Sequence, residues 1–283
     1  MEGIVHYFEG ISSFHRSLIL VGGIAFFWIW ESANPLFKFK YPKWQHAGVN
    51  VFFTITTILV NFSLAFFLLL TSDWVVDNKF GVIQWLPFLP LAVQILIGLL
   101  LLDFIGAWLI HWLEHKIKWL WKFHLIHHTD TFVDTTTANR HHPGESVFRF
   151  LFTVIAVIVS GSPLWLVFLY QSISVVMAQF NHANIRLPAW IETILNRIIV
   201  TPGMHHVHHH YQQPLTDMNY GNIFSLWDRI FGTYVAVKQE ELCYGVDTHI
   251  YPEEHSKVKN LLQIPFQKYR KPATQPKKEL NTR

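Results

Sequence analysis

Four stretches of the chain are almost free of charged residues, and they set the first expectation for the fold. Residues 17–30, 47–71, 83–110 and 147–179 form nearly continuous apolar runs. Because a membrane-spanning helix needs about 20 such residues, the pattern predicts an all-α, polytopic integral membrane protein with about four transmembrane helices. The run at 17–30 is short for a span, and Ala33 and the flanking aromatic residues extend it.

The run at 147–179 is interrupted by Ser160-Gly161-Ser162-Pro163, a sequence typical of a turn. We therefore expect a membrane hairpin at 147–179, with arms that are each shorter than a full span. No Ser/Gly-rich linker divides the chain, so residues 1–283 are expected to form a single integral domain. Its expected parts are transmembrane helices (1–110), a histidine cap in two parts (111–146 and 180–250), the hairpin (147–179) and a basic tail (251–283).

The loops carry unequal positive charge, and this predicts an orientation. The chain is only 14% charged, and its basic residues gather in the loops at 31–46 and 111–146 and in the C-terminal part. The loop at 72–82 holds Asp73 and Asp77 against Lys79. The positive-inside rule then places the basic loops in the cytoplasm and the N-terminus outside. The basic tail has two interpretations that stay open, a solvated end or contact with anionic head groups.

Two shorter segments have the pattern of helices at the membrane surface. Trp119, Trp121 and Phe123 precede His124 and suit an interfacial helix that carries the histidines after it. Between residues 188 and 200, apolar residues recur at helical spacing with polar residues on the other side. This second segment is predicted to be an amphipathic helix lying in the membrane surface.

Thirteen of the 18 histidines fall between residues 111 and 142 or between 182 and 210. They form three blocks, His111-x3-His115, His124-x2-His127-His128 and His205-x2-His208-His209. Residues three and four apart share a helix face, so each block is expected to aim its imidazoles at one point. Neutral imidazole is the commonest metal ligand in proteins, and these blocks offer enough of them for two ions. From the residues alone, iron, zinc and copper remain open.

Other kinds of site find little support. The single cysteine, Cys243, excludes an intramolecular disulfide and a thiolate-rich metal site. The chain has no Gly-x-Gly-x-x-Gly or Gly-x4-Gly-Lys-Ser/Thr loop and no aromatic–basic pattern for nucleic acid, so no nucleotide cofactor is expected. The first 16 residues lack a positive n-region and a cleavage site for a signal peptide. His142-Pro143-Gly144-Glu145 departs from the haem motif of cytochrome b5, and no separate haem domain surrounds it.

The order and spacing of these motifs match one known family. Asp103, His111-Trp-Leu-Glu-His115 and Leu120-Trp-Lys-Phe-His124-Leu-Ile-His127-His128 precede Arg140-His-His-Pro143-Gly-Glu145. Gln179-Phe-Asn-His182, Thr201-Pro-Gly-Met-His205-His-Val-His208-His209, Asp217-Met-Asn-Tyr-Gly221 and Leu226-Trp-Asp-Arg-Ile-Phe-Gly-Thr233 follow. Over roughly residues 100–235 the chain resembles the fatty acid hydroxylase/sterol desaturase superfamily of membrane di-iron enzymes. It is most similar to the alkylglycerol monooxygenase and C-5 sterol desaturase branches.

The resemblance implies a ligand set for two iron ions. The implied ligands are His111, His115, His124, His127, His128, His182, His205, His208 and His209. Counting from Thr201-Pro202 favours this register over His206, His209 and His210. Where some relatives carry another histidine a turn after His182, this chain has Arg186, which puts the ligand set there in question. Asp103, His142, His206 and Asp217 are candidates for outer positions that support the ligands.

The resemblance also implies an activity, an O2-dependent hydroxylation of an unactivated C–H bond in a lipid drawn from the bilayer. A fatty acyl chain, a sterol, an ether lipid or a carotenoid are all open as substrates. Desaturation on the same site is an alternative, because both outcomes begin with abstraction of a hydrogen. Electrons would come from a cytochrome b5, a ferredoxin or a reduced pterin. The metal site is expected on the cytoplasmic side.

Two alternatives of other classes stand beside this hypothesis. A divalent-metal transporter with a histidine-rich loop would need acidic groups along its spans, and only Asp103 lies within an apolar run. A zinc-dependent membrane hydrolase would need a carboxylate base within a histidine block. Glu114 is the residue that keeps the hydrolase open.

Overall fold

The computed structural model describes residues 2–273, and these residues form a helical protein without β-strands, as the apolar pattern predicts. The basic tail beyond residue 273 lies outside the described residues. The long helices are α2 (Ser13–Ala33), α3 (Lys43–Asp77), α5 (Leu91–Asp103), α8 (Pro143–Ser160) and α9 (Leu164–His182). The shorter helices are α1 (Glu2–Glu9), α4 (Val82–Trp85), α6 (Ile110–Lys116), α7 (Lys118–His128), α10 (Ala189–Leu195), α11 (Pro202–His208), α12 (Leu226–Ile230), α13 (Pro252–Ser256) and α14 (Val258–Gln263).

Among the described residues, five helical stretches are long and apolar enough to cross a membrane, which makes this a polytopic membrane protein. The sequence indicated about four. The difference arises at 147–179, where the expected short hairpin is instead α8 of 18 residues and α9 of 19 residues. Glu145 and Asn181 lie inside these helices with buried side chains. Such polar residues make the helices look shorter in the sequence than they are.

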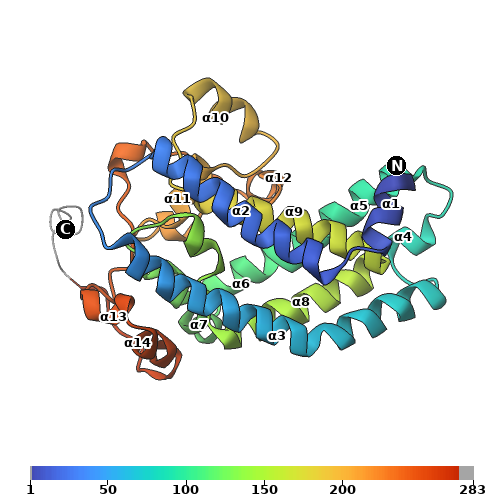
Figure 1. The fold of residues 1–283 in the computed structure, drawn as a ribbon, viewed down its shortest axis with the longest axis horizontal. Helices are drawn as coiled ribbons and strands as arrows, with labels where there is room; N and C mark the ends of the chain where they lie inside the picture. Colours follow the sequence, from blue (N-terminus) through green and yellow to red (C-terminus); the bar gives the residue numbers. More distant parts are fainter. Residues whose placement is uncertain (1, 274–283) are drawn as a thin grey trace.

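The long helices run side by side and form the body of the molecule (Figure 1). Helix α3 packs along α8, α2 packs along α9, and α5 packs against both α8 and α9. Their contact is apolar, with Leu102, Ala156, Val157 and Val167 fully buried between them. Between helices in a bilayer, contact of this kind stabilises the pair through close van der Waals packing, because lipid tails are as apolar as the side chains.

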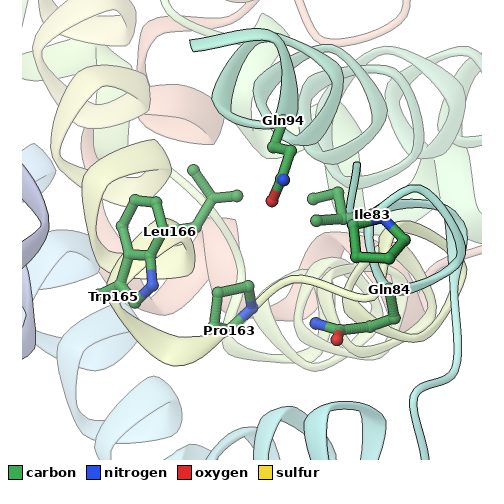
Figure 2. Close-up of a pocket in the computed structure, with 7 residues that line it drawn as sticks. Ile83, Gln84, Gln94, Pro163, Trp165 and Leu166 are labelled. Atoms are coloured by element: carbon green, nitrogen blue, oxygen red, sulfur yellow. The ribbon is translucent and has the colours of Figure 1, made fainter. Parts of the chain in front are cut away.

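One end of the bundle contains the loop between α3 and α5 and the turn between α8 and α9. The two segments touch at Gly81 and Gly161, where a Cβ on Gly81 would clash with the backbone of Gly161. Both glycines have positive φ, so neither position tolerates a side chain without strain. Gln84 Nε2 donates to Gly161 O at 2.8 Å. A cavity of about 310 Å³ opens here, lined by Ile83, Gln84 and Trp165 among others (Figure 2).

The histidine blocks lie at the other end of the bundle. From Gln94, at the cavity, to His111, the continuous helical chain rises about 25 Å at 1.5 Å per residue. A π-helical segment, Phe104–Leu109, joins α5 to α6 on this path. The loop after α2 also lies at this end, because Leu36 N donates to Asn184 O at 2.9 Å. The basic loops therefore share one end of the molecule, and their cytoplasmic placement remains a prediction.

Two segments near this end differ from the sequence expectation. Helix α10 covers only Ala189–Leu195, and the amphipathic pattern continues through a turn to residue 200. The tail is not simply solvated, because α13 and α14 fold back onto the bundle. Leu261 is fully buried beside Phe53 and Ile126. Apolar residues between the lysines, which the charge count overlooked, explain this packing.

Candidate metal centre

Nine histidines converge on two adjacent groups at the cap end of the bundle. In each group, one ring nitrogen from every member lies within 4.8 Å of those of the others. The first group, called site A, consists of His111, His115, His124, His128 and His208. The second, called site B, consists of His127, His182, His205 and His209. These are the nine histidines that the resemblance implied, in the 205/208/209 register, and His206 and His210 belong to neither group.

The helices divide the histidines between the two sites by their periodicity. On α6 and α7, the pairs His111/His115 and His124/His128 are four residues apart and face site A. On α11 and its C-cap, His205 and His209 face site B. The expectation that each block points at one site is therefore wrong. Neighbours such as His127 and His128 turn about 100° apart on a helix, so the blocks serve both sites and bring them together.

A short segment, residues 217–220, holds three of the site A histidines from behind. His111 Nδ1 lies 2.8 Å from Tyr220 O, and His208 Nδ1 lies 2.8 Å from Met218 O. His115 Nδ1 lies 3.2 Å from Asp217 Oδ1. A carbonyl or carboxylate only accepts a hydrogen bond, so each Nδ1 carries the proton. The Nε2 atoms of the three rings are then left as acceptors.

Glu145 holds a fourth site A histidine in the same way. Its Oε1 lies 2.7 Å from His124 Nδ1 and 2.8 Å from His141 Nδ1. Arg149 Nε donates to this carboxylate at 2.9 Å, and its Nη2 reaches Glu114 at 2.5 Å. The sequence analysis did not assign Glu145, His141 or Arg149 to the site, although the i, i+4 spacing of His141, Glu145 and Arg149 was a usable signal.

In site A, the Nε2 lone pairs of four histidines are directed at one another. His111 Nε2 and His124 Nε2 are 3.0 Å apart, although both rings donate through Nδ1. The Nε2 atoms of His115 and His208 are buried and have no hydrogen-bond partner in the described structure. A neutral imidazole has one N–H, so four acceptors meet here without a proton between them. A bound cation removes this repulsion.

The spacing of the nitrogens fits a metal ion with octahedral geometry. His124 Nε2 lies 3.0 Å from His111 Nε2 and 3.1 Å from His128 Nε2. In site B, His182 Nε2 lies 3.1 Å from both His127 Nε2 and His205 Nε2. For metal–nitrogen bonds of about 2.1 Å, neighbouring ligands are about 3.0 Å apart in an octahedron and about 3.4 Å apart in a tetrahedron. Nine imidazoles also exceed what two closed tetrahedral zinc sites use.

Burial keeps the cap histidines in the neutral form that binds metal. Desolvation, followed by the other histidines nearby, lowers the pKa of His124, His127, His128, His205 and His209 well below the ordinary value. Desolvation alone would raise the pKa of Asp217. Its contacts with His115 and Lys116 outweigh that effect and lower the pKa to about 2. Asp217 is therefore a charged acceptor behind His115.

Of the outer candidates, only Asp217 has a hydrogen bond to the ring of a site histidine in the described structure. Asp103 does not reach His111; it accepts hydrogen bonds from Ile223 N and Phe224 N at 3.2 Å and from Trp227. His142 caps α8, with Nδ1 accepting from Gly144 N. His206 points to the Tyr244 hydroxyl at 2.6 Å, and its Nε2 lies 3.2 Å from His182 O. A π-helical segment, Phe104–Leu109, lies between Asp103 and His111, so counting i, i+8 along a regular helix does not apply here.

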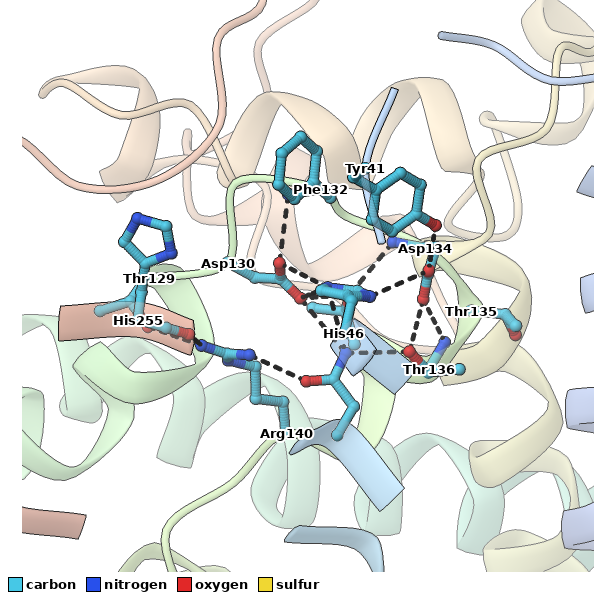
Figure 3. A network of polar contacts seen from close by, with 12 residues as sticks. Tyr41, His46, Thr129, Asp130, Phe132, Asp134, Thr135, Thr136, Arg140 and His255 are labelled. Carbon is cyan, nitrogen blue, oxygen red and sulfur yellow. Dashed lines mark hydrogen bonds and ion pairs between the residues drawn. The ribbon is translucent and has the colours of Figure 1, made fainter. Parts of the chain in front are cut away.

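A second polar network supports the end of α7 (Figure 3). His46 lies between two buried carboxylates, 2.8 Å from Asp130 Oδ1 and 3.3 Å from Asp134 Oδ2. Arg140 is buried and donates to Ile126 O, Thr129 Oγ1 and Asn50 Oδ1. Burial would raise the pKa of Asp130, but His46 and Arg140 lower it. The network ties the chain after His128 to α3.

These features define an all-helical membrane protein with a buried, histidine-lined centre whose two groups could each hold a metal ion. Comparison with known proteins agrees with the resemblance seen in the sequence. Residues 95–233 match the fatty acid hydroxylase family. No solved structure shows significant similarity.

Curated relatives include several lipid-modifying enzymes. The chain is 27% identical over 151 residues to ornithine lipid hydroxylase OlsE of Rhizobium tropici, covering 53% of this chain and 43% of the relative. It is 32% identical to human alkylglycerol monooxygenase, covering 54% of this chain and 33% of the relative. Methylsterol monooxygenase 2-2 of Arabidopsis thaliana is 28% identical over 77% of this chain and 82% of its own length. The match thus spans less than half of the first two relatives.

Proposed function

We propose that this protein is a membrane-bound oxygenase that hydroxylates an unactivated C–H bond of a lipid, using two iron ions held in sites A and B. His111, His115, His124, His128 and His208 would hold one ion, and His127, His182, His205 and His209 the other. The observation that carries the proposal is the set of unprotonated Nε2 atoms facing one another in site A.

Three further observations support iron and this reaction. The nitrogen spacing suits octahedral coordination, which leaves open positions beside five and beside four histidines. The relatives are named as hydroxylases and monooxygenases of lipids. Glu114 binds Arg149 and lies 3.6 Å from His124 Nδ1, behind the ring, so it is poorly placed as the base of a hydrolase.

Iron bound in this way supplies the activation of dioxygen, with two electrons and two protons from outside, so that one oxygen enters the C–H bond and the other leaves as water. The chain itself does three things. It holds five of the imidazoles by their Nδ1 atoms, those of His111, His115, His124, His182 and His208, it keeps the ligands nearly free of water, and it places them at the cap end of α5 and α9. A lipid would reach the site from the bilayer.

The electron donor and the side of the membrane belong to the same proposal. A cytochrome b5, a ferredoxin or a reduced pterin would deliver electrons to the cap, and the basic loops favour the cytoplasmic side. We also propose that the chain acts as one domain, because α14 contacts the short segment Ile264–Phe266 and this segment contacts α7, which joins the tail to the cap. Desaturation of the lipid is the alternative outcome on this site.

The test combines metal analysis with lipid analysis in cells that express the wild type, His208→Ala or His6→Ala. His6 is an exposed histidine at the far end of the chain and serves as the control. We expect iron in the wild type and in His6→Ala, and a lipid that gains one oxygen from labelled dioxygen. His208→Ala should insert normally and form no such lipid. Equal lipid profiles in all three, with the donor supplied, would overturn the proposal.

A further inference from the structure

A groove of about 540 Å³ lies between α10 and the segment 234–240, on the protein surface beside the cap. Three cations line it, Arg197, Arg229 and Lys238, together with the carboxylates of Glu192 and Glu240. None of these residues belongs to site A or site B. The groove is therefore a separate feature that needs its own explanation.

The charges in the groove are not equally available. Arg229 Nη2 donates to Asn196 O at 2.8 Å, and its guanidinium lies 3.9 Å from the centre of the Tyr234 ring. These contacts fix the arginine in place. Glu192 is turned away toward α11, where it accepts hydrogen bonds from the Thr201 hydroxyl and the Gly203 backbone. Lys238 and Arg197 are exposed beside one exposed carboxylate, Glu240, so the open part of the groove keeps a net positive charge.

The position of α10 indicates at which level of the membrane surface the groove lies. The other face of α10 and the turn after it expose Trp190 (67%), Ile194 (55%) and Ile198 (66%). In Figure 1, α10 projects sideways from the bundle near the cap. An interfacial helix sinks its apolar face about 5–10 Å into the boundary between head groups and acyl chains. A helix is about 10–12 Å wide, so its polar face, with the groove, lies at the level of the head groups.

We propose that this groove binds the anionic head group of a membrane lipid and holds that lipid beside α11. Guanidinium groups pair well with phosphate and carboxylate oxygens, and basic residues at a membrane surface attract anionic lipids. Glu192 joins the groove to the first turn of α11, the helix that carries His205 and His208. The inference deepens the proposed function and rests on it for the step from bound lipid to substrate.

Lipid binding by the detergent-purified protein tests the inference without turnover. Native mass spectrometry measures the affinity for dioleoyl phosphatidylglycerol and, as the zwitterionic comparison without net charge, dioleoyl phosphatidylcholine. The groove variant is Arg197→Gln/Lys238→Gln, and the control is Lys38→Gln/Lys40→Gln, which removes the same charge from an exposed loop at the same end. We expect the groove variant to bind phosphatidylglycerol at least about tenfold more weakly. The control should match the wild type.

Three results would overturn the inference. They are full affinity in the groove variant, an equal loss of affinity in both variants, and binding of inorganic phosphate alone as tightly as the lipid. The last result would assign the groove to a free anion. Arg229→Gln gives a second measurement at the fixed cation, and it should also weaken binding of phosphatidylglycerol while phosphatidylcholine binding stays constant.

The two proposals fail in distinguishable ways. The binding assay needs neither iron nor an electron donor, so loss of oxygenated lipid with intact head-group binding would contradict only the proposed function. Unchanged head-group binding in the groove variant, with normal hydroxylation by the wild type, would contradict only the groove. If both hold, the groove variant should need at least about tenfold more anionic lipid for half-maximal product formation.

Discussion

Oε1 of Glu145 lies 2.7 Å from Nδ1 of His124, and neither side chain is exposed. The carboxylate fixes the proton on Nδ1 and turns Nε2 toward site A. Nε of Arg149 donates to Oε1 of Glu145 at 2.9 Å and balances the charge of the carboxylate. The site thus depends on a residue that contributes no ligand, as carboxylates behind metal-bound imidazoles commonly do.

Replacing Glu145 tests this dependence. We expect Glu145→Gln to insert and fold, but to bind iron about 10–100-fold more weakly, because the amide loses the charge that orients His124. Iron retained after equilibration with graded chelator gives the affinity. Glu9→Gln, at an exposed position in α1, is the matched control. Wild-type iron affinity in Glu145→Gln would contradict this role.

The division of the histidines predicts that the two ions are lost separately. His208 belongs to site A and His205 to site B, although both are on α11. Each alanine variant should retain about one ion per chain under chelator conditions in which the wild type retains both. Mass spectrometry of the intact protein with bound metal measures this directly. Loss of both ions in each variant would show that the sites are not independent.

The sequence predicted the helical membrane class from its apolar runs, and the spacing of the three blocks predicted eight of the nine histidines that come together. His182 lies outside the blocks and was implied only by the family resemblance. The sequence did not predict how the blocks divide. The direction of His127 relative to His128 follows from the helix, but the site each one meets depends on where α9 and α11 pack. That placement is tertiary and leaves no local pattern.

The groups that accept hydrogen bonds from the ligand histidines were harder still to predict. The carbonyl of Tyr220 receives His111 Nδ1, and a backbone oxygen has no signature in a sequence. Asp103 was chosen because a carboxylate in an apolar run must have partners. That reasoning was sound, but the partners are the backbone nitrogens of Ile223 and Phe224. Asp103 thus holds the loop that follows Tyr220 instead of a ligand.

Arg140 should be important for stability. Its buried guanidinium joins three segments, through Ile126 O and Thr129 Oγ1 at the end of α7, Asn50 Oδ1 on α3 and His255 O on α13. Lysine offers a single ammonium and cannot reproduce this fork. We expect Arg140→Lys to lower the free energy of unfolding by about 2–4 kcal/mol. The thermal midpoint in detergent measures it, with exposed Arg197→Lys as the control. Equal midpoints would show that the network of Figure 3 is not stabilising.

His249 gives the cap a sensitivity to acid that is separate from the metal centre. Burial and the Arg270 guanidinium lower the pKa of His249 to about 4, while an unfolded chain titrates near its ordinary value of about 6.5. Between these values the unfolded state binds the additional proton. Stability is therefore lost as the pH falls below about 6.5, by about 2 kcal/mol at pH 5.

His249→Gln removes this titration, so its thermal midpoint should fall less than that of the wild type between pH 7.5 and pH 5. Exposed His6→Gln is the control and should behave as the wild type does. The comparison is made on iron-loaded protein, so that the site histidines contribute equally to every sample. If His249→Gln and the wild type lose the same stability on acidification, His249 is charged in the folded state. The inference that burial and Arg270 lower the pKa of His249 would then be wrong.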